Sequence, residues 1–181
     1  VREGSEVHIY LEKKPESVSL IKKKLDGQRL NYEEMRKIIK DISDGLLNEI
    51  EISYFVAAGY INKFSFNETV SLTKAMIDTG QVIKFNHGVV VDKHCIGGVA
   101  GNRTTPIVVA ILAAAGLKVP KTSSRSITSA AGTADTIEVL CKVEFPINKL
   151  KQIVNKTNAC LVWGGSLNLA PSDDRIIRVE H

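Results

Sequence analysis

The stretch that decides the fold runs from residue 88 to residue 102, GVVVDKHCIGGVAGN. It begins with a short β-branched run, which favours a strand, and Asp92, Lys93 and His94 follow directly. A glycine-rich loop comes next, and an apolar helix rich in small residues is expected from Thr104 to Ala115. A strand, a glycine loop and a helix in this order are typical of a parallel α/β sheet.

The loop after this strand has the properties of an anion site. Gly97, Gly98 and Gly101 let the backbone approach a ligand and point N–H groups at it. The following helix presents its N-terminus at the same place, and Lys93 adds a full positive charge. The glycine spacing fits neither a Walker loop nor the dinucleotide-binding fingerprint. A glycine-rich turn that only packs is the alternative interpretation.

A second polar loop, Ser123–Thr133, joins a strand expected at Lys118–Thr122 to helical turns expected at Ala134–Leu140. It carries six hydroxyl groups and the guanidinium of Arg125, which suit phosphate and sugar oxygens. Because ligands of α/β sheets bind at the carboxyl ends of the strands, both loops are expected to meet there. A connection rich in helix-capping residues is the alternative.

The alternation continues with a helix expected from Pro146 to about Lys156 and a strand at Ala159–Trp163. By contrast, residues 17–80 show the periodicity of four short helices. The predicted fold is therefore an α/β fragment, in which a small α-helical bundle domain precedes the first part of a parallel-sheet α/β domain.

Two details of the helical half can be predicted. Asn31 is expected to cap the second helix and Asn67 the fourth. On the fourth helix, we expect an inward face made of Val70, Thr73 and Ile77.

The composition is that of an ordinary globular protein. Of the 181 residues, 44% are hydrophobic and 24% are charged, and the net charge is +4. The run Lys22–Lys24 is interpreted as the solvated face of a helix rather than as a nucleic-acid patch. Cys95, Cys141 and Cys160 fit neither a disulfide framework nor a zinc site, which predicts reduced thiols and a cytoplasmic location. No apolar run approaches the roughly 20 residues that span a bilayer.

Several side chains near the loops could act chemically. His94 is either an acid or hydrogen-bond donor, or simply a packed histidine. Asp92 is interpreted as orienting the loop and Asp135 as starting a helix, although either could be a catalytic carboxylate. Cys95 has no obvious base beside it and is not proposed as a catalytic thiolate. Trp163 could cover a base or sugar, but a buried aromatic at a strand end is the favoured interpretation.

These segments resemble the thymidine phosphorylase family, which includes the AMP phosphorylases. Asp92–Val99 resembles the family motif Asp-Lys-His-Ser-(Thr/Ile)-Gly-Gly-Val, and the second phosphate segment and a Leu-Ala-Pro-Ala-Asp stretch are matched as well. The matching residues are 123–125 with 130–135, and 169–173. The sequences at 101–106 and 126–129 look closest to the archaeal AMP phosphorylases. The resemblance extends from about residue 15 to the end.

The resemblance implies a helical domain hinged to a larger α/β domain, with catalysis in the cleft between them. It implies that phosphate attacks C1′ of the ribose and displaces the base, giving adenine and ribose 1,5-bisphosphate from AMP. The resemblance implies inorganic phosphate as the co-substrate and no metal or organic cofactor. The helical domains of the family pair, so a homodimer or larger homo-oligomer is expected, with no nucleic-acid or membrane partner.

The resemblance also assigns residues to roles. His94 and Arg125 are the catalytic candidates, with His94 near the reacting sugar. The phosphate-binding candidates are Lys93, Cys95, Thr104, Ser123 and Thr133. The nucleotide-binding candidates are Gly98, Ser124, Arg125, Ser126, Ile127, Thr128, Ser129 and Thr133.

Three features depart from the family pattern. Cys95 stands where the family has a serine, and a thiol is a poorer hydrogen-bond donor to phosphate. Glu180 falls where pyrimidine-specific members carry an arginine, which argues against a strict thymidine enzyme. The aspartate that protonates the leaving base would lie beyond His181. The chain is thus expected to be an internal fragment without turnover of its own.

The expected domain boundaries follow. Residues 1–14 are the tail of an N-terminal module, with a strand at Val7–Leu11 and a linker. Residues 15–85 form the helical domain, and 86–181 begin the α/β domain, with 165–181 returning to the helical domain. Two alternatives remain open: a pyrimidine nucleoside phosphorylase, and an inactive helical dimerisation fragment. The related anthranilate phosphoribosyltransferase shares the architecture but requires magnesium.

Overall fold

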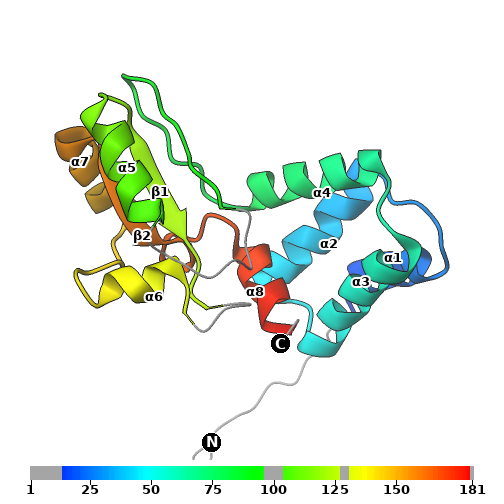
Figure 1. The fold of residues 1–181 in the computed structure, drawn as a ribbon. Helices are drawn as coiled ribbons and strands as arrows, with labels where there is room; N and C mark the ends of the chain where they lie inside the picture. Colours follow the sequence, from blue (N-terminus) through cyan, green and yellow to red (C-terminus); the bar gives the residue numbers. More distant parts are fainter. Residues whose placement is uncertain (1–13, 96–103, 127–130, 180–181) are drawn as a thin grey trace, which may run out of the picture.

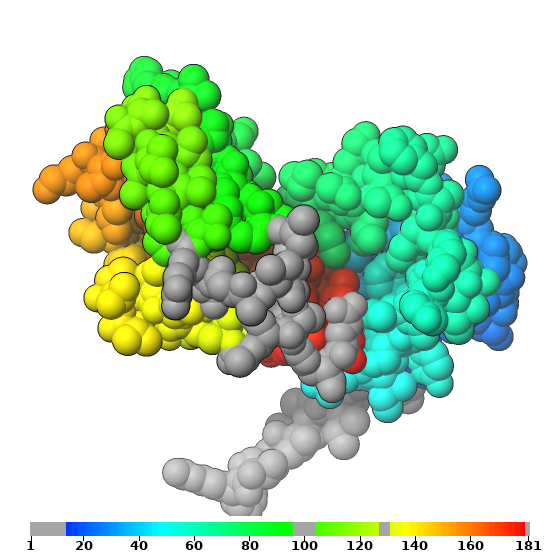
Figure 2. All heavy atoms as spheres, viewed as in Figure 1, coloured from blue at the N-terminus to red at the C-terminus, as the bar shows by residue number. Residues whose placement is uncertain are grey.

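The structure is a computed structural model that describes residues 14–95, 104–126 and 131–179. It contains a helical bundle and a small α/β unit, which form two lobes in the space-filling view (Figures 1 and 2). This arrangement confirms the predicted fold class. The strand predicted at Val7–Leu11 lies outside the described residues.

The bundle is made of the four predicted helices and one more helix from the end of the chain. Its elements are α1 (Ser17–Leu25), α2 (Tyr32–Asp44), α3 (Glu49–Asn62), α4 (Phe66–Thr79) and α8 (Pro171–Val179). Three of these helices begin with a capping box, in which the N-cap side chain and the glutamate three residues later satisfy each other's backbone N–H groups. The pairs are Asn31 with Glu34, Asn48 with Glu51, and Ser65 with Glu68.

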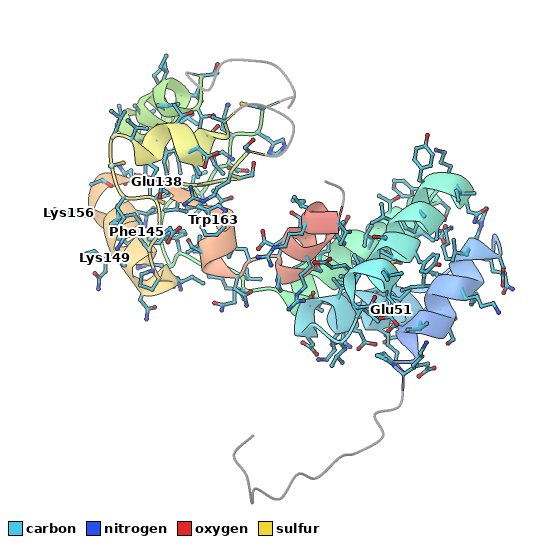
Figure 3. All side chains as sticks on the ribbon, turned by 90° about the horizontal axis from the view of Figure 1, so that it is seen from below. Glu51, Glu138, Phe145, Lys149, Lys156 and Trp163 are labelled. Carbon is cyan, nitrogen blue, oxygen red and sulfur yellow. The ribbon has the colours of Figure 1, made fainter. Side chains whose placement is uncertain are left out.

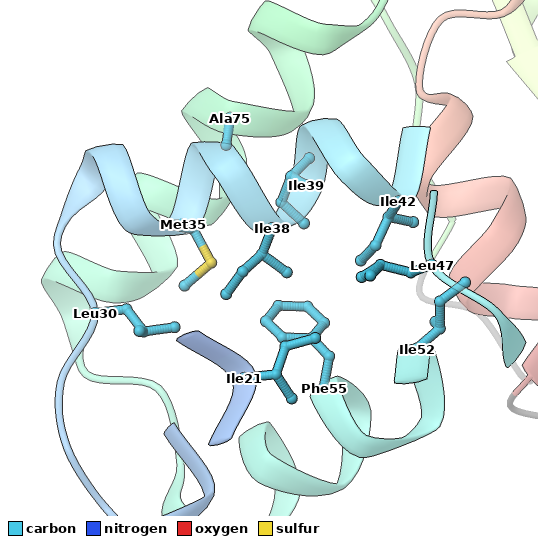
Figure 4. Close-up of a cluster of buried hydrophobic side chains, with 10 residues drawn as sticks. All are labelled: Ile21, Leu30, Met35, Ile38, Ile39, Ile42, Leu47, Ile52, Phe55 and Ala75. Atoms are coloured by element: carbon cyan, nitrogen blue, oxygen red, sulfur yellow. The ribbon is translucent and has the colours of Figure 1, made fainter. Parts of the chain in front are cut away.

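The core of the bundle lies between α1, α2 and α3, with α4 closing one side (Figure 4). Met35, Ile38, Ile39 and Ile42 of α2 are fully buried, because their spacing places them on one helical stripe. Phe55 of α3 packs into the same cluster from the other side. These apolar side chains hold the bundle together.

Two predictions about α4 are wrong. Its N-cap is Ser65 rather than Asn67. The predicted inward face is turned outward, since Val70 and Ile77 are 36% and 54% exposed. The residues of α4 that are buried are Glu68 and Ala75. The spacing of apolar residues could not indicate that the polar residue Glu68 lies on the inner face.

The prediction that the whole run Lys22–Lys24 is solvated is also wrong for its last member. The side chains of Lys24 and Glu68 are each 2% exposed and form an ion pair of 2.8 Å. Lys24 also donates to the Lys63 carbonyl, and Glu68 accepts from the backbone N–H of Leu30 and Ser65. Burial alone would raise the pKa of Glu68, but these hydrogen bonds lower it to about 2. The pair thus connects α1 to the start of α4.

The α/β unit contains two parallel strands with helices around them. Its elements are α5 (Thr104–Ala114), β1 (Val119–Ser123), α6 (Thr133–Glu138), α7 (Ile147–Thr157) and β2 (Ala159–Trp163). The strands pair in register from Val119 with Ala159 to Ser123 with Trp163. The strand expected at residues 88–91 is reduced to one parallel bridge between Val90 and Lys118.

The chain returns to the bundle after β2. A 3₁₀ turn, η1 (Gly164–Leu167), leads to α8, which packs against α2, α3 and α4 (Figure 1). Gln81, just after α4, donates to the carbonyl of Asn168, so the two crossings between the units lie together. A Cβ at Gly80 would lie 1.7 Å from the Leu169 carbonyl oxygen, so this close crossing needs glycine.

Candidate phosphate and nucleotide site

Both predicted loops leave the α/β unit at the same edge. Lys118 donates its N–H to Val89, and Val91 donates to Lys118, so residues 89–91 run beside the start of β1. The polar residues Asp92 and Lys93 therefore follow one segment, and Ser123 ends the adjacent strand. This edge is where parallel α/β sheets bind ligands.

The first loop places a cation, a hydroxyl and a thiol together. Lys93 Nζ donates to Thr105 Oγ1 at 2.9 Å and also to Cys95. Cys95 Sγ lies 3.7 Å from the same Thr105 oxygen. The hydrogen bonds from Lys93 and then from Thr105 lower the pKa of the exposed Cys95 thiol. Thr105 is buried in the first turn of α5, so this cluster sits at a helix N-terminus, which favours an anion.

A second lysine, Lys121, lies next to the cluster of Lys93, Cys95 and Thr105. Lys121 on β1 is 7% exposed, and its Nζ reaches Asp92 at 3.3 Å. Asp92 itself is largely exposed. This contact ties the segment before the first loop to the strand before the second loop.

The second loop is closed by Asp135 in the first turn of α6. Its Oδ2 accepts the backbone N–H groups of Ser126 and Gly132, each at 2.8 Å, and its Oδ1 accepts from Arg125 at 3.0 Å. The pKa of the Asp135 carboxyl is lowered, most of all by the hydrogen bond from the N–H of Gly132. Burial opposes this by raising the pKa, and the hydrogen bond from Arg125 lowers it further. A Cβ at Gly132 would come within 2.5 Å of the Ser124 carbonyl, so the chain can close only with glycine there.

Arg125 is held by carboxylates on its other side as well. It donates to both oxygens of Glu138, at 2.6 and 3.1 Å, and to Glu144 at 3.0 Å. Its guanidinium carbon lies 4.8 Å from the ring centre of Trp163, at the end of β2. Figure 3 shows Glu138 and Trp163 on the same part of the α/β unit. The contacts with Glu138, Asp135 and Glu144 raise the pKa of Arg125, so it stays charged.

The structure brings some of the predicted site residues together and leaves others apart. Lys93 and Cys95 are in contact, His94 is exposed between them, and Ser124 and Ser126 are exposed on the second loop. Ser123 ends β1, and Thr133 begins α6. Thr104 is exposed at the start of α5. Gly98, Ile127, Thr128 and Ser129 lie outside the described residues. The ligand-binding roles of all these residues stay predictions.

Two residues at this edge were not predicted from the sequence. Thr105, not the adjacent Thr104, contacts Lys93, because the first turn of α5 points its hydroxyl inward. Lys121 lies inside the segment that was predicted only to form a strand. Its spacing of two residues from Val119 places both on the same face of the strand, and this is the one signal that the sequence offers.

The arrangement can bind an anion through side-chain cations, a hydroxyl and a helix N-terminus. Within residues 14–95, 104–126 and 131–179, histidine, cysteine and acidic residues form no group of three that could hold a metal ion. In the same part of the chain, every helix is too short or too polar to cross a bilayer.

Comparison with known protein families decides the classification. Residues 18–80 match the helical bundle domain of a glycosyl transferase family, and residues 87–177 match the α/β domain of that family. The chain belongs to this glycosyl transferase family. The two matched regions coincide with the bundle helices α1–α4 and with the α/β unit together with most of α8.

Individual relatives are similar over the full chain. It is 48% identical over 181 residues to AMP phosphorylase 1 of Archaeoglobus fulgidus, covering 100% of this chain and 36% of the relative. It is 49% identical over 179 residues to a Legionella pneumophila protein provisionally named thymidine phosphorylase, covering 99% of this chain and 35% of the relative. The chain thus spans about a third of the length of these relatives.

A solved structure supports the fold. Anthranilate phosphoribosyltransferase from Thermus thermophilus superposes with a TM-score of 0.72 at 19% identity, over 89% of this chain and 49% of that protein. At this identity the similarity concerns the fold alone.

Proposed function

We propose that the protein containing this chain is a phosphorylase of nucleoside 5′-monophosphates, which converts AMP and phosphate to adenine and ribose 1,5-bisphosphate. The observation that carries the proposal is the identity of about half of all residues to AMP phosphorylases along the full chain. The Lys93 cluster at the start of α5 supports it, because phosphorolysis needs a site for an anionic nucleophile.

Different residues bind the two anions of the reaction, the inorganic phosphate and the 5′-phosphate of the nucleotide. Lys93, Thr105 and the N-terminus of α5 hold the inorganic phosphate, and the second loop with Thr133 holds the sugar and 5′-phosphate of the nucleotide. Arg125, whose terminal N–H groups donate to Asp135, Glu138 and Glu144, keeps that loop in place beside the nucleotide. A phosphate oxygen attacks C1′, the bond from C1′ to the base nitrogen breaks, and the base leaves with the bonding electrons and takes up a proton. Holding both reactants in line supplies much of the rate. His94 lies near the reacting sugar.

Side-chain cations supply the charge compensation in this proposal, so no metal or organic cofactor takes part. Phosphorolysis by the complete protein should continue in the presence of a chelator. Loss of activity on chelation, with recovery on adding magnesium, would instead favour a transferase of the anthranilate phosphoribosyltransferase type.

The substrate is tested with the complete gene product. AMP, adenosine, thymidine and uridine are each incubated with phosphate, and release of free base is measured together with ribose 1,5-bisphosphate or ribose 1-phosphate. We expect AMP to be cleaved much faster than adenosine. Equal rates for AMP and adenosine would refute the AMP assignment.

A pyrimidine nucleoside phosphorylase is the second candidate. The specific observation in its favour is the 49% identity to the Legionella protein provisionally named thymidine phosphorylase. Cleavage of thymidine or uridine in preference to AMP would establish it.

We also propose that the protein acts in the cytoplasm as a homodimer or larger homo-oligomer that pairs through its helical bundle. Cys95, Cys141 and Cys160 are all free thiols, as a reducing compartment would keep them. Apolar side chains on the outside of α3 support the pairing: Ile50, Tyr54 and Ile61 are 68%, 55% and 66% exposed. Their spacing of four and seven residues places them on one helical stripe.

A further inference from the structure

A second polar pocket lies on the side of the α/β unit where β1 begins. It has a volume of about 250 Å³ and is lined by residues 84–87, by Lys118, and by Lys151 and Asn155 of α7. Because β1 has five residues, about 16 Å of strand separates Lys118 from the loop after Ser123. The pocket is therefore distinct from the candidate phosphate and nucleotide site.

The pocket is strongly basic. Lys84, Lys118 and Lys151 line it, and none of its lining residues is acidic. Among the described residues, none of these three lysines forms an ion pair with a carboxylate. Three ammonium groups that share one pocket without neutralisation repel each other and create a local positive potential. A bound anion removes this repulsion.

Neutral groups hold Lys118 in place. Its Nζ donates to Asn155 Oδ1 at 2.7 Å and lies 5.3 Å from the ring centre of Phe85. Gly88 has a φ of +85°, and a Cβ there would lie 3.3 Å from Lys118 Cε, so the chain passes close over the lysine stem. These contacts orient the ammonium group and leave its charge available.

We propose that this pocket is a second anion site, which binds a phosphate-bearing small molecule. Lys84, Lys118 and Lys151 surround the phosphate oxygens, and the side-chain amide of Asn86 is a further neutral donor. The pocket does not depend on the proposed phosphorolysis, because it shares no residue with the candidate site.

The position of the pocket gives its occupancy a structural consequence. Residues 81–88 connect α4 of the bundle to the α/β unit, and Ile83 and Phe85 pack against the core of that unit. An anion held between Lys84 of this connection and Lys151 of α7 adds a cross-link between them. Binding therefore restrains the connection between the two units.

The test uses NMR of the complete protein after reductive methylation with ¹³C-formaldehyde, which keeps each lysine charged. The signals of Lys84, Lys118 and Lys151 are assigned from single lysine-to-arginine variants. Inorganic phosphate and AMP are titrated separately at constant ionic strength. We expect the three signals to shift together with one dissociation constant, while those of Lys149 and Lys156, on the outer part of α7 (Figure 3), stay in place.

The outcomes are distinct. Shifts with inorganic phosphate but not AMP identify free phosphate as the ligand, and tighter binding of AMP identifies the phosphate of a nucleotide. If neither probe moves the three signals, or if all five lysine signals shift alike, the proposal is wrong.

A matched pair of double variants provides an independent check. Lys84→Gln with Lys151→Gln should weaken binding, followed on the Lys118 signal, by about tenfold, because two of three charges are lost. Lys149→Gln with Lys156→Gln removes the same net charge from α7 outside the pocket and should leave the affinity unchanged. Equal effects of the two double variants would show that net charge alone acts, and would overturn the proposal.

Discussion

The hydroxyl of Thr105 contacts both Lys93 and Cys95, whereas the neighbouring Thr104 is exposed. Thr105→Val keeps the shape of the side chain but leaves Lys93 without this acceptor. A hydrogen bond to a charged group contributes about 1.5–3 kcal/mol, so we expect the KM for phosphate to rise roughly tenfold or more. Steady-state kinetics at varied phosphate concentration measure this KM.

Thr104→Val is the control for this experiment. It should change the KM for phosphate less than Thr105→Val does. The reverse order would mean that Thr104 is the phosphate ligand, as the family resemblance assigns, and that the contact of Thr105 with Lys93 is only structural.

The buried pair of Lys24 and Glu68 predicts a large effect on stability. Lys24→Met leaves a carboxylate that is 2% exposed without its cation, which costs about 3–5 kcal/mol. The melting temperature of the complete protein, and hydrogen exchange in α1 and α4, should both report this loss. Lys22→Met removes an exposed charge from the same helix and should change little. Equal effects of the two variants would contradict the importance of the pair.

The same pair predicts how stability depends on acid. The pKa of Glu68 is lowered from 4.5 to about 2 in the folded protein, so its contribution is present above pH 4.5 and is lost as the pH falls toward 2. The shift corresponds to about 3 kcal/mol. Urea unfolding at pH 7, 4.5 and 3 should therefore show a steeper loss for the natural protein than for Glu68→Gln. Glu33→Gln, at an exposed position of α2, should retain the steep loss.

At the scale of elements, helices were predictable where local sequence decides them. The stripe of α2 follows from residue spacing, and its cap follows from the type of residue at position 31. Local composition and breaking residues likewise predicted α5, β1, α7 and β2. The inner face of α4 was not predictable, because Glu68 is buried by a partner 44 residues earlier in the chain. Helix α8 was missed as an element, since it is short and its docking surface is formed by the distant helices α2, α3 and α4.

The candidate site shows the same limit. The glycines and hydroxyls of the two loops point to an anion from sequence alone. The contact of Lys121 with Asp92 arises from parallel strand pairing. The carboxylates of Glu138 and Glu144 reach Arg125 through the orientation of α6 and the path of the chain after it. Partners of this kind are set by tertiary structure and leave no periodic signal.

The crossing of the two inter-unit segments can be tested at Gly80. Gly80→Ala places a Cβ 1.7 Å from the Leu169 carbonyl oxygen, so the backbone must shift, at a cost of about 1–3 kcal/mol. Gly164→Ala, where a Cβ would meet its nearest atom at 3.7 Å, is the matched control and should be close to neutral. Thermal unfolding measures the melting temperatures of the two variants. If Gly80→Ala is as stable as Gly164→Ala, the tight crossing is not required.

At the scale of the molecule, the connections on either side of the α/β unit both run into the bundle. Residues 80–88 lead from α4 to the first loop, and residues 164–170 lead from β2 to α8. Gln81 and Asn168 join these two connections by a backbone hydrogen bond. Any change in the angle between the units must therefore alter these two segments, and residues 84–87 of the first one line the basic pocket.

The bundle is also where a second copy is expected to bind. Helix α3 is apolar on nearly all sides, and a helix of this kind is normally buried on nearly all sides. One face packs into the bundle core through Ile52 and Phe55, while Ile50, Tyr54 and Ile61 are exposed. Burial of this stripe against the same stripe of a second copy satisfies both surfaces, as twofold symmetry requires.

Tyr54→Glu places a charge in the middle of that stripe. An unpaired charge buried in an interface costs about 3 kcal/mol or more, so we expect the dissociation constant of the dimer to rise at least about a hundredfold. Light scattering of the complete protein across a concentration series measures it. Ile77→Glu puts the same charge on an exposed apolar position of α4 and should leave the assembly intact. If the natural protein is monomeric at all concentrations, it does not pair through α3. If Tyr54→Glu leaves the oligomer unchanged, the interface lies on another surface.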